Sequence, residues 1–249
     1  MQIIYTLLAI YALVFFTCTV IIFTPCYFLL FLLSDPLKAP FRAHRLSRTW
    51  ASLVIAGLLV RVKIKGKEKL DPNATYVCIA NHLSQLDVPV YAMACLPAIR
   101  FLAKAELGKI PLMGYVIRRT YFMVDRSNKS DRSKSMAAMQ KSLGEGIGLF
   151  LCPEGTRNRT GEPLLPFKDG AFRLAIEAQV PLAALVIYNS HRRNSPRIPL
   201  SLIPGTIEGE WIEVIDTKGL TEKNTEELKD RVRKNMENHI IAWRKEHGR

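Results

Sequence analysis

The sequence predicts an α/β fold: a mixed, mostly parallel sheet flanked by helices, preceded by an N-terminal helical membrane anchor. Residues 1–34 contain no charged side chain, whereas the rest of the 249-residue chain carries all 35 Lys and Arg and all 22 Asp and Glu. In that remainder, apolar runs of strand length alternate with segments of helical periodicity, an order typical of α/β domains. We therefore divide the chain into a membrane-associated segment at 1–60 and a cytoplasmic α/β domain at 61–249.

The N-terminal apolar segment is too long to cross a membrane as one upright helix. As a helix, residues 1–34 would extend about 50 Å, whereas the hydrocarbon core of a bilayer is roughly 30 Å thick. We expect the segment to tilt, to turn back, or to break at Pro25, which lacks a backbone donor. A basic linker at 35–48 and a short apolar helix at 49–60 would follow. Two arrangements stay open: a spanning anchor, or a two-helix hairpin held in one leaflet with the basic linker at the headgroups.

The charge distribution indicates which partners suit the domain. The formal net charge is +13, and basic residues follow directly after the apolar segment. By the positive-inside rule the chain after this segment lies in the cytoplasm, and its basic residues suit an anionic membrane surface. No zinc-finger spacing, helix-turn-helix signature or aromatic RNA-binding pattern is visible, so we expect no nucleic acid partner. Neither a His-Glu-x-x-His motif nor a Cys-x-x-Cys pair is present, so we expect no metal.

Periodicity then predicts the elements of the domain in order along the chain. Basic and apolar residues alternate at 61–65, as in an edge strand. Apolar runs predict strands buried on both faces of a sheet at 76–80, 147–152 and 182–188. Helical spacing predicts helices at 88–96, 133–143, 170–178 and 226–246. The apolar stripe of the last helix is more typical of core packing than of a membrane contact.

A polar cluster follows the first buried strand, at the place where open α/β sheets bind ligands. His82 and Asp87 are five residues apart, about 140° away from a common face on a regular helix. A loop at His82 and a helix starting near Ser84 would instead bring the carboxylate to the imidazole. The same residues also fit a capping pattern, with Ser84 as N-cap and Asp87 three residues later. The two interpretations are compatible.

A second cluster consists of basic residues and a glycine turn. Asp125-Arg126 follows an apolar run, and Pro153-Glu154-Gly155-Thr156-Arg157 follows the buried strand at 147–152. A glycine-containing turn lets backbone and Arg approach a ligand closely. Arg offers a planar fork that matches two phosphate oxygens, and Lys offers a point charge. Several such contacts together predict a site for a phosphomonoester.

The order and spacing of these blocks resemble the glycerolipid acyltransferases, specifically the 1-acylglycerol-3-phosphate acyltransferases. The blocks are His-x4-Asp at 82–87, Asp125-Arg126, Pro-Glu-Gly-Thr-Arg at 153–157 and Val-Pro at 180–181. Thr120, Met123, Cys152 and the Leu-Ala-Ala run after Val-Pro depart from the usual pattern, but none removes a charged or catalytic position. The resemblance implies a glycerolipid acyltransferase-like fold, and an acyl group transferred from acyl-CoA or acyl carrier protein to the sn-2 hydroxyl of lysophosphatidic acid. The product would be phosphatidic acid, an intermediate of phospholipid biosynthesis.

The resemblance also implies a role for each site residue. His82 would be the general base and Asp87 would set its tautomer, as the carboxylate does in a Ser-His-Asp triad. The acceptor would be bound by Arg126, Glu154, Gly155, Thr156 and Arg157, with Lys104 near the same phosphate. Acyl-CoA or acyl carrier protein would be a co-substrate, and no cofactor is implied.

Several alternatives stay open. The acceptor could be another lysolipid, such as a lyso-ornithine lipid or a lysophospholipid, or the protein could bind lipids without catalysis. A serine hydrolase is disfavoured because the chain has no Gly-x-Ser-x-Gly elbow. The short chain resembles bacterial members of the family, which predicts the cytoplasmic face of a bacterial inner membrane. The endoplasmic reticulum membrane is the alternative location.

Overall fold

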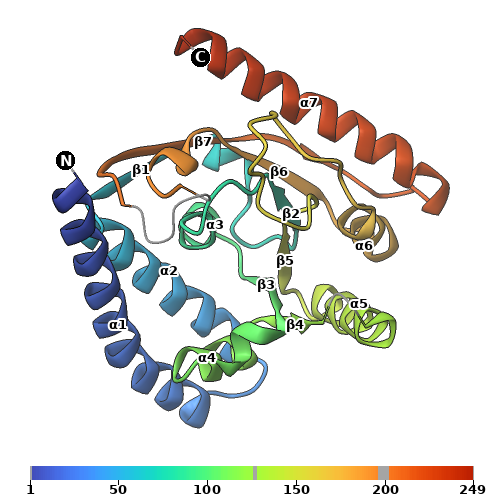
Figure 1. Ribbon diagram of the computed structural model, residues 1–249. Helices are drawn as coiled ribbons and strands as arrows, with labels where there is room; N and C mark the ends of the chain where they lie inside the picture. The colour runs from blue at the N-terminus through green and yellow to red at the C-terminus, as the bar shows by residue number, and fades with distance from the viewer. Residues whose placement is uncertain (1, 126–127, 196–201, 249) are drawn as a thin grey trace.

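The computed structural model describes residues 2–125, 128–195 and 202–248. Within them seven strands form one mixed sheet with the order β1-β7-β6-β2-β5-β3-β4 (Figure 1). The strands are β1 (Val60–Lys65), β2 (Val77–Ala80), β3 (Ile99–Lys104), β4 (Phe122–Val124), β5 (Gly148–Leu151), β6 (Leu182–Ile187) and β7 (Gly205–Ile215). All neighbours are parallel except β6 and β7, which run antiparallel. The predicted fold class is confirmed.

The helices cover both faces of this sheet. They are α1 (Gln2–Leu33), α2 (Ala39–Gly57), α3 (Asp87–Ala94), α4 (Met113–Thr120), α5 (Lys129–Gly144), α6 (Gly170–Ala178) and α7 (Thr225–Glu246). Short 3-10 segments are η1 (Lys67–Lys69), η2 (Ala105–Lys109), η3 (Ser190–Arg192) and η4 (Glu222–Asn224). One apolar core lies between the sheet and helices α2 and α3, and the other lies between the sheet and helices α5, α6 and α7.

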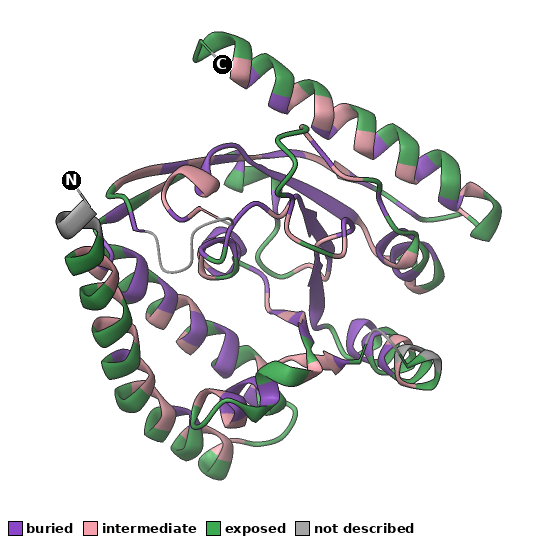
Figure 2. Cartoon of the chain, in the orientation of Figure 1, coloured by how far each residue is buried: buried purple, intermediate pink, exposed green. Residues whose placement is uncertain are grey.

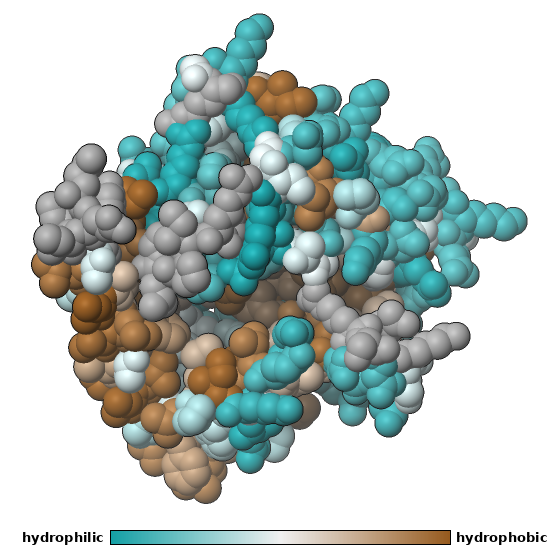
Figure 3. Space-filling model, viewed as in Figure 1, coloured by the Kyte–Doolittle hydropathy of each residue, from teal (hydrophilic) through white to brown (hydrophobic). Residues whose placement is uncertain are grey.

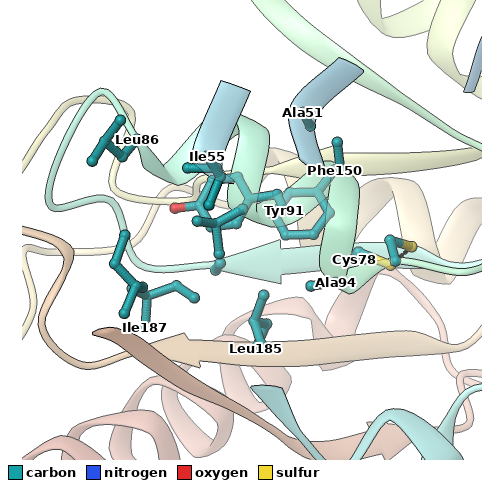
Figure 4. Close-up of a cluster of buried hydrophobic side chains, with 14 of the residues drawn as sticks. Ala51, Ile55, Cys78, Leu86, Tyr91, Ala94, Phe150, Leu185 and Ile187 are labelled. Atoms are coloured by element: carbon teal, nitrogen blue, oxygen red, sulfur yellow. Dashed lines mark hydrogen bonds between the residues drawn. The ribbon is translucent and has the colours of Figure 1, made fainter. Parts of the chain in front are cut away.

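The central strands lie where the sequence predicts them. Each is apolar throughout because its two faces pack into the two different cores. In β2, Cys78 and Ala80 belong to the first core, whereas Val77 and Ile79 belong to the second. Strands β2, β5 and β6 are buried throughout, as their continuous apolar runs predict. Figure 4 shows the first core, where Tyr91 of α3 and Phe150 of β5 lie beside Ile55 of α2.

Strand β1 lies at the edge of the sheet, as predicted. Strands β3, β4 and β7 are present in the structure but are not predicted by the sequence pattern. Strand β4 has three residues, and charged residues interrupt β3 and β7. In β7 the glutamates alternate with Ile207 and Trp211, which are fully buried. Such strands are stabilised by their neighbours in the sheet rather than by a local apolar pattern.

The predicted helices match α3, α6 and α7 closely, and α5 begins four residues before the predicted start at 133. Helix α4 is not predicted by the sequence pattern. The apolar stripe of α7 packs against the sheet as expected: its members are Leu228, Val232, Met236, Ile240 and Trp243, all buried.

The N-terminal segment differs from the expectation in two ways. Helix α1 continues through Pro25, so the predicted break is wrong, and the chain reverses only after Leu33. Figure 1 shows α1 as a curved helix, which accommodates the missing backbone donor without an interruption. The expected linker at 35–48 is mostly helical, because α2 begins at Ala39, with Pro40 in its first turn.

Helices α1 and α2 form an antiparallel pair joined by aromatic side chains. Tyr11 donates a hydrogen bond to the carbonyl of Gly57, and the hydroxyls of Tyr27 and Ser47 are 2.6 Å apart. Between these contacts Trp50 stacks on Phe16, with ring centroids 6.0 Å apart. The buried side of α2 faces the sheet, whereas α1 is mostly exposed (Figure 2).

Most of α1 is apolar and exposed to the surroundings. Within Thr6–Leu33, an 18-residue window has a mean hydropathy of 2.5, and only 11% of that window is buried. This helix is long and apolar enough to cross a membrane. Its side chains form a continuous apolar surface at the left of the molecule in Figure 3.

Substitution at Gly148, the first residue of β5, tests the close packing of the sheet. An alanine Cβ there would lie 2.6 Å from the carbonyl oxygen of Tyr76, which belongs to the backbone and cannot turn away. We expect Gly148→Ala to lower the free energy of unfolding by about 1–3 kcal/mol. Gly144→Ala is the control, because a Cβ there has no neighbour within 4 Å and alanine favours the helix. Equal melting temperatures of the two variants would contradict this account of the sheet.

Candidate active site

The parallel strands bring the predicted site loops to one edge of the sheet. Strands β2, β5, β3 and β4 are consecutive neighbours and point the same way, with Ile79 paired to Leu151 and Lys104 paired to Val124. The His-x4-Asp, Pro-Glu-Gly-Thr-Arg and Asp-Arg blocks each follow one of these strands. They therefore all begin at the carboxyl edge, where α/β sheets bind their ligands.

His82 and Asp87 form the hydrogen bond that their spacing suggests. The imidazole Nδ1 lies 2.8 Å from Asp87 Oδ2. Asp87 is fully buried, whereas 20% of the His82 side chain is exposed. An ionised carboxylate can only accept, so Nδ1 donates and the Nε2 of the neutral ring keeps its lone pair. His82 therefore has the geometry of a general base.

The Asp87 carboxylate also holds the turn that carries the histidine. Its Oδ2 accepts from the backbone N–H of Leu83 at 2.6 Å and of Ser84 at 2.7 Å. The Ser84 hydroxyl accepts from the N–H of Leu86 at 2.9 Å. The helix starts at Asp87 rather than near Ser84, so Ser84 is not its N-cap. Asp87 thus organises the turn and orients the imidazole at once.

Glu154 fixes the backbone of His82 from the neighbouring loop. Its Oε1 accepts from the N–H of His82 at 2.8 Å, and its Oε2 accepts from the N–H of Leu165 at 2.9 Å. The carbonyl of His82 accepts from the N–H of Asn158 at 2.7 Å. Only 4% of Glu154 is exposed, and this burial raises the pKa of its carboxyl group. The sequence places Glu154 among the acceptor-binding residues, whereas here both of its oxygens are engaged by backbone N–H groups.

The rest of the Pro-Glu-Gly-Thr-Arg turn lies closer to the surface. Gly155 has φ +72°, and a Cβ there would lie 2.9 Å from Nζ of Lys168. The Lys168 side chain therefore lies against this turn. Thr156 is exposed and Arg157 is half-buried. Among the described residues, neither Arg157 nor Lys168 forms an ion pair.

The two remaining basic candidates follow β3 and β4. Lys104 ends β3 and forms an exposed ion pair with Glu106, with Nζ and Oε1 2.8 Å apart. This hydrogen bond from Lys104 lowers the pKa of Glu106. Arg126 lies outside the described residues, two positions after the last residue of β4. The structure thus joins His82, Asp87 and Glu154 directly, and it places Lys104 two strands from β2.

Asn81, which precedes His82 and to which the sequence analysis assigns no role, is a further contributor to the site. Its side-chain amide donates to the carbonyl of Ile187 and accepts from the N–H of Ile187, both at 2.8 Å. The Tyr91 hydroxyl donates to the carbonyl of Asn81, and the buried Tyr91 ring stacks on Phe150 at 4.4 Å. Burial raises the pKa of Tyr91 well above its usual range, so it remains a donor. The only local signal is a polar residue at the end of an apolar run.

Known proteins are similar to this chain over the part that contains these site residues. The sequence profile of the Acyltransferase family matches residues 61–188. The 1-acyl-sn-glycerol-3-phosphate acyltransferase alpha of Mus musculus is 32% identical over 185 residues, which cover 71% of this chain and 62% of that protein. The 1-acyl-sn-glycerol-3-phosphate acyltransferase of Saccharomyces cerevisiae is 32% identical over 183 residues, or 70% of this chain and 58% of the yeast protein. The chain thus spans about three fifths of the length of these two relatives.

A bacterial relative and a solved structure extend the comparison. The 1-acyl-sn-glycerol-3-phosphate acyltransferase of Haemophilus influenzae is 32% identical over 176 residues, which cover 69% of this chain and 70% of that protein. The crystal structure of the 1-acyl-sn-glycerophosphate (LPA) acyltransferase, PlsC, from Thermotoga maritima superposes with a TM-score of 0.83. It covers 98% of this chain and 97% of its own, at 24% identity. The shared fold therefore includes the N-terminal helices.

Substitution of Glu154 tests its structural role in this site. Glutamine has one acceptor oxygen, so its amide N–H₂ would face an N–H that the carboxylate now binds. We expect Glu154→Gln to lower the free energy of unfolding by about 1–3 kcal/mol, the cost of an unsatisfied buried group. Chemical denaturation of the detergent-purified chain measures this difference. Glu162→Gln, an exposed residue of the same loop, is the control and should be neutral; equal losses in both variants would contradict the assignment.

Proposed function

We propose, because this chain belongs to the Acyltransferase family, that it transfers a fatty acyl group from acyl-CoA or acyl carrier protein to the sn-2 hydroxyl of lysophosphatidic acid. The product is phosphatidic acid, and the place of the reaction is phospholipid biosynthesis. The observation that carries this proposal is the 2.8 Å bond between His82 Nδ1 and the buried Asp87 carboxylate. It leaves Nε2 of a partly exposed imidazole to act as a base. The names of the relatives support acyl transfer to this acceptor, and they name no acyl donor.

In the proposed reaction the substrate alcohol takes the place of an enzyme nucleophile. His82 Nε2 removes the proton of the sn-2 hydroxyl as its oxygen attacks the thioester carbonyl. The tetrahedral intermediate then collapses, the carbon–sulfur bond breaks, and the leaving thiolate takes the proton from the imidazolium. A new ester and a free thiol result, with His82 returned to its neutral form.

Two buried carboxylates prepare His82 for this cycle. Asp87 is held by two backbone N–H groups in addition to the imidazole, so it needs no reorganisation when the imidazolium forms. Glu154 and Asn158 hold the N–H and the carbonyl of His82, respectively. The ring is therefore fixed through its backbone and through its side chain. Glu154 acts here as a positioning residue.

The acceptor phosphate is proposed to lie against the loop at 155–157. Arg157 supplies a fork for two phosphate oxygens, with Gly155 and Thr156 beside it. Arg126, outside the described residues, is proposed as a second guanidinium for the same phosphate. Lys104 contributes charge from the end of β3, where its partner Glu106 is exposed and easily exchanged for a phosphate. Neither a metal nor a cofactor takes part in this scheme.

We also propose that α1 lies within one leaflet of the membrane rather than across it. Along its whole length α1 touches the domain: Tyr11 bonds to Gly57 near one end, and Phe28 packs on Tyr115 of α4 near the other. A helix that crossed the bilayer would carry α2 and α4 into the hydrocarbon with it. The proposed location is the cytoplasmic face of a bacterial inner membrane, with the endoplasmic reticulum as the alternative. A lipid acceptor could then enter the site from the leaflet.

Thiol release from acyl-CoA tests the activity and its base together. With lysophosphatidic acid present, we expect acceptor-dependent release that falls by about 10²–10⁴-fold in His82→Ala. His239→Ala, on α7 and outside the loops that carry the proposed site residues, should keep the wild-type rate. Release that needs no acceptor would identify a thioesterase. If acyl carrier protein and a panel of other lysolipids also give no release, the chain binds lipid without turnover.

Arg157→Ala tests the phosphate assignment separately. A lost charged hydrogen bond costs about 1.5–3 kcal/mol, so KM for lysophosphatidic acid should rise roughly tenfold or more. Arg159→Ala, two residues along the same loop, should leave this KM within about twofold. Unchanged acceptor kinetics in Arg157→Ala would remove Arg157 from the site.

A further inference from the structure

A cavity of about 380 Å³ lies between α2, β1 and α3. Its lining residues are Arg45, Arg48, Thr49, Ser52, Val62, Lys67 and Met93. The four residues from α2 follow the spacing i, i+3, i+4 and i+7, so they share one face of the helix. The volume lies within the range of about 300–1,000 Å³ that is typical of small-molecule sites.

The polar wall of this cavity is strongly cationic. Within the described part of the chain, no carboxylate lies within ion-pair distance of Arg45, Arg48 or Lys67. The Nε of Arg48 is buried and has no hydrogen-bond partner. A buried donor without a partner is costly, and the protein itself does not fully satisfy the Arg48 guanidinium. The remaining wall, formed by Val62 and Met93, is apolar.

The two hydroxyl groups that line this cavity already donate to backbone carbonyls, so they are not donors for a ligand. Thr49 donates to the carbonyl of Arg45 at 3.2 Å, and Ser52 donates to the carbonyl of Arg48 at 2.9 Å. The donors that remain for a ligand are therefore one ammonium and two guanidinium groups. Such groups together match a phosphate, whose oxygens accept from planar forks and point charges.

The cavity is separate from the candidate active site. None of its lining residues belongs to the loops around His82. In the sheet β1 is three strands from β2, about 14 Å at roughly 4.8 Å per strand. Met93 lies near the end of α3 that is remote from Asp87. A ligand in this cavity would not occupy the position proposed for the acceptor phosphate.

We infer that this cavity is a second phosphate site, which binds a phosphomonoester through Arg45, Arg48 and Lys67. The apolar wall suits a phosphate attached to a larger group, either the phosphomonoester headgroup of phosphatidic acid or the 3′-phosphate of coenzyme A. Both sources carry the same dianion. The inference does not depend on the proposed acyl transfer, because inorganic phosphate alone can test it.

The test is phosphate binding by the detergent-purified full chain, measured by isothermal titration. Arg48→Gln/Lys67→Gln should weaken binding at the cavity by about tenfold or more, since the loss of even one charged hydrogen bond is worth about that factor. Lys63→Gln is the matched control, because Lys63 is an exposed residue of β1 next to Val62 that does not line the cavity. Arg157→Ala should keep the cavity site. A melting temperature close to wild type shows that the double variant is folded.

Three results of the phosphate titration would overturn the inference. They are unchanged phosphate affinity in the double variant, an equal loss in Lys63→Gln, and complete loss of phosphate binding in Arg157→Ala. Two further arms distinguish the sources: coenzyme A with a free thiol, and phosphatidylcholine vesicles with or without phosphatidic acid. Binding of coenzyme A that depends on Arg48 and Lys67 assigns the nucleotide, and binding of phosphatidic acid vesicles that depends on them assigns the lipid. If both kinds of binding are unchanged in the double variant, the inference is wrong.

Discussion

Three hydrogen bonds converge on one oxygen of the buried Asp87 carboxylate, and the site geometry depends on them. One comes from the His82 ring, and two come from the backbone of the turn between β2 and α3. The buried charge is stable only while these donors surround it, because water cannot reach it. The same contacts therefore set the start of α3, the path of the turn and the orientation of the imidazole. The Asp87 carboxylate is therefore needed both for the local fold and for the proposed chemistry.

The sheet provides the second constraint by joining loops that are distant in the sequence. The Glu154 carboxylate binds the N–H of His82 although 72 residues separate them. This contact is possible because β2 and β5 are parallel neighbours, whose carboxyl ends meet at one edge. The Asn81 amide ties the other neighbour, β6, to the same turn. His82 is thus held by the strands on both sides of its own.

The N-terminal helices link this site to the membrane and to the basic cavity. Helix α2 has two uses: one side packs on α1 through Trp50, and another carries Arg45 and Arg48 into the cavity. A cationic cavity lined by α2, the helix on which α1 packs, is suited to phosphate groups at a membrane surface. The proposed acceptor site and the cavity would then recognise the same chemical group at two places on one molecule.

The sequence alone determined the fold class, the apolar N-terminal segment, the central strands and the pairing of His82 with Asp87. These depend on local apolar patterns and on residues close in the chain. Tertiary structure alone decided that Glu154 holds His82, that Asn81 bridges to β6 and that the basic run before residue 49 is helical. The tertiary structure also determined that β3, β4 and β7 form strands and that α1 continues through Pro25. The physical reason is that long-range hydrogen bonds and neighbouring strands outweigh local preference, and neither leaves a periodic signal in the sequence.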